Sequence, residues 1–181
     1  MLNNVQRTTL LQIARDSIAA VLEGRRPDLN RYAIDDDLRR PAGAFVTLND
    51  RDGELRGCIG SIEPVAPLCQ AVSLSAVSAA FRDPRFPPVK RDEFPSLHLE
   101  ISVMGPILPV NDVSEVEVGR DGLIIRRGHN AGLLLPQVAT DYGWDLETFL
   151  AQTCMKAGLP PTAWRSPDTR IERFSAEVFG E

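Results

Sequence analysis

The order of the expected strands and helices is the feature that most limits what this chain can fold into. Apolar segments typical of strands occur in neighbouring pairs, and helical segments stand between groups of strands rather than between every two. Regular alternation of strand and helix would predict a parallel sheet, whereas this mixed order favours the α+β class. The chain has 181 residues, a length that suits one domain, so we expect a single domain over residues 1–181.

The first half of the sequence predicts two helices and a hairpin. Asp52-Gly53 stands between two apolar runs, and this dipeptide is typical of a tight hairpin turn. The segment after Pro67 is rich in Ala, Ser and Val, small side chains that let a helix lie close to a sheet. The expected elements are helices over residues 4–24 and about 65–81, strands Ala44–Leu48 and Glu54–Ile62, and a surface loop over Pro27–Pro41.

In the second half, Leu97–Met104 alternates strictly between apolar and polar residues and predicts a strand. The alternation places His98 and Glu100 on the polar face of that strand. Asp145 is expected to cap the last helix, which Gly158 and the prolines after it end. The other expected elements are strands Val113–Val118, Leu123–Arg127, Leu133–Leu135 and Arg170–Val178, and helices over residues 136–142 and 146–157.

Composition and charge exclude several classes of function. The net charge is −5, and an acidic balance argues against nucleic acid as a partner, because binding a phosphate backbone needs clustered Lys and Arg. No segment is a signal peptide or approaches about 20 apolar residues, so we expect no membrane contact and a cytoplasmic location. The three cysteines form no CxxC pair, and phosphate-loop and HExxH motifs are absent. We therefore expect neither metal nor cofactor.

The segment LRGCIG at residues 55–60 is the most unusual stretch of the chain. Glycine in a strand is unfavourable, so Gly57 and Gly60 are expected where another group approaches the backbone closely. Strand alternation places Arg56, Cys58 and Gly60 on one face. That face offers a guanidinium, a thiol and a bare patch of backbone, which makes it the first candidate site.

Cys58 has two interpretations. A cation such as Arg56 favours the thiolate, so Cys58 is a candidate nucleophile next to an anion-binding arginine. Alternatively, Cys58 is a buried thiol that fills a tight corner, since free cysteine is among the most buried residue types. If the polar face of the strand after Leu97 lies in the same cleft, Glu100 joins the site as an acid or base. If that face points into water, Glu100 is an ordinary surface residue.

Asp83-Pro84-Arg85 follows the second helix and supplies two further candidates. Asp83 can accept hydrogen bonds from backbone groups of the turn. Arg85 can either hold an anion or pin Asp83 and Glu100 by ion pairs. The candidate ligand-binding residues are therefore Arg56, Gly57, Gly60, Asp83 and Arg85, and the candidate catalytic residues are Cys58 and Glu100.

Several segments in a fixed order resemble the AMMECR1 domain, and the resemblance extends from about residue 5 to 179. It implies an α+β fold with a larger and a smaller lobe around a mostly antiparallel sheet with flanking helices, and it places the RGCIG strand in the cleft between the lobes. Asp121 stands where many members have His, so we leave it out of the site. The matching segments are LRGCIGS at 55–61, AAFRDPRFPPV at 79–89, LEISVM at 99–104, GLLLPQVA at 132–139 and GWDLETFLAQTCMKAGLPPTAW at 143–164.

Prokaryotic members of that family are called AmmeMemoRadiSam system protein A. The name implies association with a Memo-like protein, similar to extradiol dioxygenases, and with a radical S-adenosylmethionine (SAM) enzyme. This chain lacks the CxxxCxxC that holds a radical iron–sulfur cluster, so such chemistry would belong to a partner.

Three hypotheses follow for the function. The chain is an accessory component that holds a small anionic ligand or a partner segment in the cleft. Alternatively, it is a stand-alone enzyme with Cys58 as nucleophile and Glu100 as acid or base. In the third, the RGCIG strand only packs the interface between the lobes.

Overall fold

A computed structural model describes all residues, 1–181, and divides into two compact units. The larger unit comprises Met1–Met104 and Glu177–Glu181, and the smaller one comprises Gly105–Ala176. The helices are α1 (Asn4–Leu22), α2 (Asp36–Arg39), α3 (Leu68–Phe81), α4 (Pro136–Asp141) and α5 (Leu146–Lys156). The strands are β1 (Ala44–Asn49), β2 (Leu55–Ser61), β3 (His98–Met104), β4 (Leu108–Pro109), β5 (Asp121–Arg127), β6 (Asn130–Leu134) and β7 (Arg170–Gly180). The mostly antiparallel sheets and flanking helices confirm the α+β class.

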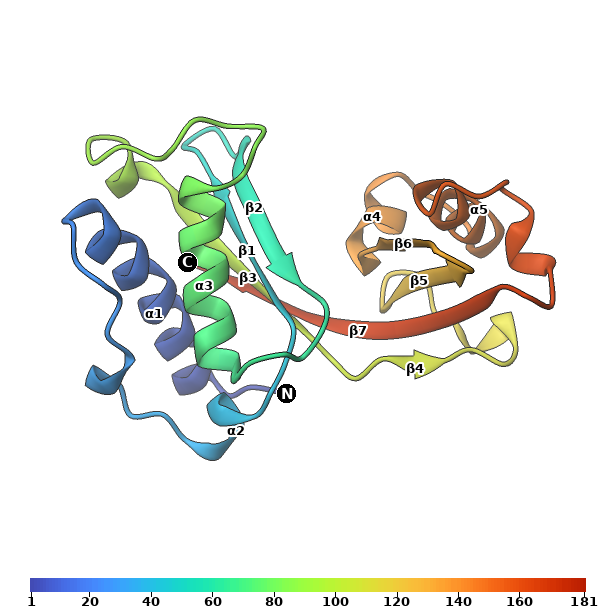
Figure 1. Cartoon of the computed structure of the whole chain (residues 1–181), viewed down its shortest axis with the longest axis horizontal. Helices are drawn as coiled ribbons and strands as arrows, with labels where there is room; N and C mark the ends of the chain where they lie inside the picture. Colours follow the sequence, from blue (N-terminus) through green and yellow to red (C-terminus); the bar gives the residue numbers. More distant parts are fainter. The chain divides into compact units, whose positions relative to one another are not determined.

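The larger unit packs α1 and α3 side by side on one face of a sheet with strand order β2-β1-β3 (Figure 1). Ala44, Val46 and Leu48 of β1 point toward these helices and are buried, while the residues between them are only half-buried. A hydrogen bond of 2.7 Å between the buried hydroxyls of Ser17 and Ser73 joins α1 to α3. One face of the sheet therefore carries the core under the helices, and the other carries both polar and apolar side chains, among them Thr47 and Phe45.

The β1–β2 hairpin forms with the turn that Asp52-Gly53 predicts. Gly53 has a φ of +82°, a backbone conformation that favours glycine. The Asp50 carboxylate accepts hydrogen bonds from the N–H groups of Asp52 and Glu54, at 2.9 Å each, and closes the turn. The register then pairs Thr47 with Cys58, with a bulge where the strands meet the turn.

The smaller unit has its own core, in which β5 pairs with β6 and β7, and α4 and α5 pack against the β5–β6 hairpin. Phe149 and Cys154 of α5 are fully buried there. The predicted caps of α5 are confirmed, because the Asp145 carboxylate accepts from the Thr148 N–H and Gly158 has a φ of +73°.

The structure corrects one predicted strand. Val113–Val118 is not a strand: Val113–Glu115 forms a 3₁₀ turn, in which Asp112 and Glu115 satisfy each other's backbone N–H groups as a capping box. The two-residue strand β4 and the short helix α2 were not predicted, and both are too short for a periodic pattern to appear in the sequence.

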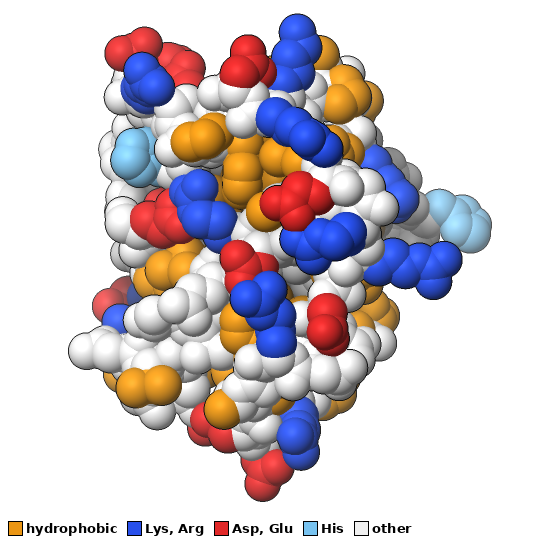
Figure 2. All heavy atoms as spheres, turned by 90° about the vertical axis from the view of Figure 1, so that its left-hand side faces the viewer, with side chains coloured by type: hydrophobic (Ala, Val, Ile, Leu, Met, Phe, Trp, Pro, Cys, Tyr) orange, Lys and Arg blue, Asp and Glu red, His pale blue; other side chains and the backbone are white.

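No helix combines the length and the apolar character that crossing a lipid bilayer requires. On the face seen in Figure 2, Lys and Arg side chains are interspersed with Asp and Glu, and small apolar areas lie between them.

Candidate functional site

A row of three side chains crosses the sheet of the larger unit on the face opposite the helices. Thr47 of β1 pairs with Cys58 of β2 on one side and with Glu100 of β3 on the other. Directly opposed residues in adjacent strands point to the same face, so the three side chains lie next to one another. The Thr47 hydroxyl lies 3.3 Å from the Cys58 Sγ and donates to it. All three residues are half-buried.

Cys58 differs from the other two cysteines in its surroundings. Cys69 and Cys154 are buried, and burial raises the pKa of both thiols by disfavouring the charged form. Cys58 is the half-buried one, so it is the thiol most open to a ligand or reagent.

The backbone of Cys58 is held by the loop that follows α3. The Cys58 N–H donates to the Asp83 carboxylate at 2.9 Å, and the Arg85 guanidinium donates to the Cys58 carbonyl at 3.4 Å. β2 is an edge strand, and these two bonds occupy its free side at Cys58. Asp83 and Arg85 therefore cap the edge as a neighbouring strand would.

Asp83 is the most deeply buried charge of this region, with a side chain that is 1% exposed. Arg85 binds both carboxylate oxygens, at 2.9 and 2.7 Å, and its own N–H adds a third bond at 3.1 Å. The hydrogen bonds from the Arg85 guanidinium, aided by the N–H groups of Cys58 and Arg85, hold the pKa of Asp83 far below its ordinary value in spite of burial.

The Arg56 side chain is directed to a second carboxylate, Glu93, with bonds of 3.2 and 2.8 Å. Its Nη2 also donates to the Pro87 carbonyl at 2.9 Å. Burial by itself raises the pKa of Glu93, but the bonds from Arg56 and from the Lys90 N–H outweigh it, so the pKa lies below its ordinary value. The remaining nitrogen of Arg56, Nη1, is buried and has no hydrogen-bond partner.

Both arginines also lie against the Phe86 ring, with the guanidinium carbon 5.9 Å from its centroid for Arg56 and 5.4 Å for Arg85. The Nη1 atom of Arg85 takes part in no hydrogen bond, and that side chain is 54% exposed. Each guanidinium is thus neutralised by its own carboxylate and keeps one nitrogen without a partner.

The close approach that the two strand glycines predict is made by the chain itself. A Cβ at Gly57 would overlap the carbonyl oxygen of Ala79 in α3, so this glycine lets the helix backbone touch the strand. A Cβ at Gly60 would overlap Phe45 and the Ala44 carbonyl. Packing of the fold therefore explains both positions without a ligand.

The structure brings some predicted site residues together and separates others. Cys58, Asp83 and Arg85 are joined by direct hydrogen bonds. Arg85 pairs with Asp83 but not with Glu100, and Arg56 pairs with Glu93. Glu100 is on the same face as Cys58, with Thr47 between them. Thr47 and Glu93 were missed. The hairpin register would have revealed Thr47, whereas nothing in the sequence links position 93 to position 56.

Two residues covered by the resemblance, Trp144 and Asp121, lie in the smaller unit. Trp144 stacks on Tyr142, with ring centroids 5.0 Å apart. Asp121 is buried and accepts from Arg120 at 2.6 Å and from the Glu117 N–H at 2.9 Å, which makes it a structural carboxylate. No group of three or more His, Cys, Asp or Glu side chains in the chain is arranged to hold a metal ion.

Comparisons with known proteins find similar sequences and a similar fold. A sequence model described as AMMECR1 matches residues 11–179. A protein of Methanothermobacter thermautotrophicus is 49% identical over 96% of this chain and 93% of its own length. Protein NEQ441 of Nanoarchaeum equitans is 39% identical over 95% of this chain and 98% of its own. The crystal structure of protein PH0010 from Pyrococcus horikoshii superposes with a TM-score of 0.86 at 42% identity, covering 95% of this chain and 89% of that one.

Proposed function

The chain belongs to the AMMECR1 family, and on that premise we propose that it is an accessory, ligand-binding protein of the cytoplasm that acts with a Memo-like protein and a radical SAM enzyme. Its binding surface is the face of the β2-β1-β3 sheet that carries Cys58, Thr47 and Glu100. The single observation that carries the proposal is this half-buried polar row, which lies on the side of the sheet away from α1 and α3.

The hydrogen bonds around the row favour binding over catalysis. The Cys58 thiol accepts from Thr47, a neutral hydroxyl, and makes no hydrogen bond to a carboxylate or imidazole that could remove its proton. The charges of Arg56 and Arg85 are used to hold Glu93 and Asp83. What remains is a set of fixed donors and acceptors, which suits recognition of a small ligand or a partner segment.

Two donors support an anionic group in that ligand. The Nη1 atom of Arg56 is buried without a partner, and such a donor costs about 1–3 kcal/mol until an acceptor reaches it. The Nη1 atom of Arg85 is also free, on a half-exposed side chain. A carboxylate or phosphate oxygen that reached either nitrogen would gain a charge-assisted hydrogen bond.

Co-purification tests the proposal. The tagged chain is expressed with the Memo-like and radical SAM proteins of the same organism, and we expect all three in one complex. Cys58→Ser and Glu100→Gln should weaken the association, while His129→Gln, an exposed change in the smaller unit, should not. Failure of the wild-type chain to retain either protein at low and at physiological salt would refute this function.

A stand-alone enzyme is the second candidate, because Cys58 is the accessible thiol and Glu100 lies one strand beyond Thr47 on the same face. In this case Cys58 is the nucleophile and Glu100 the acid or base, acting through Thr47. The measurement is the rate of iodoacetamide alkylation at pH 7. A rate well above that of free cysteine, lowered by Glu100→Gln, is the expected result, and an ordinary rate would end this alternative.

A further inference from the structure

A small groove of about 200 Å³ lies in the larger unit, between the end of β2 and the side of α3. Ile59 and Gly60 form one wall, and Ala71, Leu74 and Ser78 of α3 form the other. The lining includes two large apolar side chains that are strongly exposed, Leu74 at 64% and Val65 at 82%. Apolar side chains exposed along a groove favour a binding surface over a solvated one.

The edge of β2 next to this groove offers backbone hydrogen bonds. The N–H of Cys58 points to Asp83, which places it on the side of β2 away from β1. Backbone groups alternate in direction along an antiparallel strand, so the N–H and C=O of Gly60, two residues further on, point the same way. Neither group of Gly60 has a partner in the chain. The groove therefore combines apolar walls with an unpaired strand edge.

The free edge is short. Asp83 and Arg85 occupy it at Cys58, and beyond Ser61 the chain turns back so that Pro67 lies beside Pro41. A second copy of β2 aligned antiparallel about Gly60 would run into the Asp83–Arg85 cap. A short peptide that ends at the cap does not meet this obstacle.

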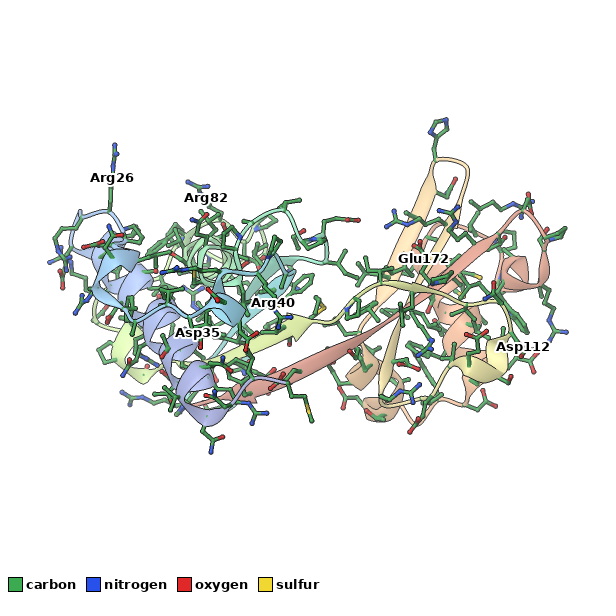
Figure 3. The ribbon with its side chains drawn as sticks, turned by 90° about the horizontal axis from the view of Figure 1, so that it is seen from below. Arg26, Asp35, Arg40, Arg82, Asp112 and Glu172 are labelled. Carbon is green, nitrogen blue, oxygen red and sulfur yellow. The ribbon has the colours of Figure 1, made fainter.

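One end of the groove is basic. There Arg82 follows Ser78 by one turn on the same side of α3, and its side chain is exposed. Figure 3 shows the Arg82 side chain extending away from the ribbon. With the exposed Arg85 three residues on, this end suits a carboxylate.

We propose that the groove binds the C-terminal end of an extended peptide, which adds to β2 as an antiparallel strand. The peptide carries apolar side chains at alternate positions, which enter the groove beside Ile59 and Leu74. Its backbone bonds to Gly60, and its terminal carboxylate faces Arg82. Strand addition of this kind takes affinity from backbone bonds and specificity from the alternate side chains. The inference goes beyond the proposed function, because it uses the other face of the sheet and stands whether or not the Cys58 face binds a ligand.

Fluorescence polarisation with a labelled peptide ending in TVTVD and a free carboxylate tests the proposal. We expect saturable binding to the full chain. Methylation of the backbone nitrogen of the last valine should weaken binding about two- to tenfold, the effect of losing one hydrogen bond. Arg82→Gln should weaken it by about two- to fivefold, the range of an exposed ion pair, and should abolish the preference for the acid over its C-terminal amide.

Leu74→Gln is the matched variant for the apolar wall, and Met155→Gln is its control. Both are exposed apolar residues of helices, at 64% and 55%, so neither change should unfold the chain. Only Leu74→Gln should reduce binding. No saturable signal up to about 1 mM peptide, the weak limit of specific affinity, or equal binding of the methylated and parent peptides, would overturn the proposal. A dimer in sedimentation velocity that Leu74→Gln abolishes would also overturn it, because the groove would then bind a second copy.

Discussion

Replacing Asp83 with asparagine tests whether the loop after α3 holds the edge of β2. The change keeps the size of the side chain, but it removes the charge that faces Arg85, and the new amide turns a donor toward other donors. The Asp83 side chain is 1% exposed, so water cannot replace the lost bonds there. Breaking a buried ion pair costs about 3–5 kcal/mol. Arg85 is half-exposed and can be hydrated, so we expect the lower limit, a loss of about 3 kcal/mol in the free energy of unfolding.

The assay is urea and thermal unfolding followed by far-UV circular dichroism. A loss of this size corresponds to a fall in melting temperature of about 6–12 °C for a chain of this length. Both tryptophans, Trp144 and Trp164, lie in the smaller unit, so their fluorescence reports that unit alone and separates a local loss from a global one. Asp168→Asn is the control, because Asp168 also pairs with an arginine, Arg127, but on the surface.

The pH dependence of the difference gives a second test. The pKa of Asp83 is lowered in the folded chain, so its stabilisation is complete above the unfolded pKa of about 4 and is lost as the pH falls below that value. The gap between wild type and Asp83→Asn should therefore be widest near pH 7 and should shrink toward pH 2. An Asp83→Asn chain as stable at pH 7 as the Asp168→Asn control would refute the reasoning.

Three further predictions concern packing and thiol chemistry. Gly57→Ala should destabilise the chain by about 1–3 kcal/mol in urea unfolding, because the new Cβ overlaps the Ala79 carbonyl and α3 must move. The control, Ser61→Ala, is an exposed change on the same strand and should have little effect. Ser73→Ala should lower the free energy of unfolding by about 1–2 kcal/mol, because it leaves the buried Ser17 hydroxyl without its partner. Adding Ser17→Ala should recover part of that loss, so a double variant whose loss equals the sum of the two single losses would contradict this. One thiol per folded chain should react with a disulfide reagent at pH 8, and all three should react after unfolding, because Cys69 and Cys154 are buried with raised pKa values. Cys58→Ser should remove the reaction of the folded chain.

Local patterns were sufficient to predict the hairpin that carries the site. A two-residue turn centred on Asp52-Gly53 pairs position 47 with 58 and 48 with 57, which is the register observed. The bulge at Asn49 changes the pairing only next to the turn. The cap of α5 was equally local, since Asp145 begins that helix as expected. Such features depend on neighbours within a few residues, so the sequence contains all the information they need.

Contacts across long separations could not be predicted in this way. The pairs Arg56–Glu93 and Cys58–Asp83 span 37 and 25 residues, and they depend on where the loop after α3 crosses the edge of β2. The same limit explains the glycines: the sequence showed that something approaches the strand, but it did not show that α3 does so. Val113–Val118 was misjudged because its alternating pattern is short and the Asp112–Glu115 capping box competes with a strand.

The way Cys58 is held argues for a role of its side chain beyond packing. Both backbone polar groups of Cys58 are bonded to Asp83 and Arg85, so the direction of its thiol is fixed by hydrogen bonds from a distant loop. Cys69 and Cys154 lie instead within α3 and α5, and their side chains are packed into the two cores. If the thiol only filled space, Cys58→Ser would destabilise the chain. If the cap holds the strand and the thiol is there to be used, Asp83→Asn should destabilise the chain strongly, while Cys58→Ser should cost about 1 kcal/mol or less and still weaken the association with partner proteins.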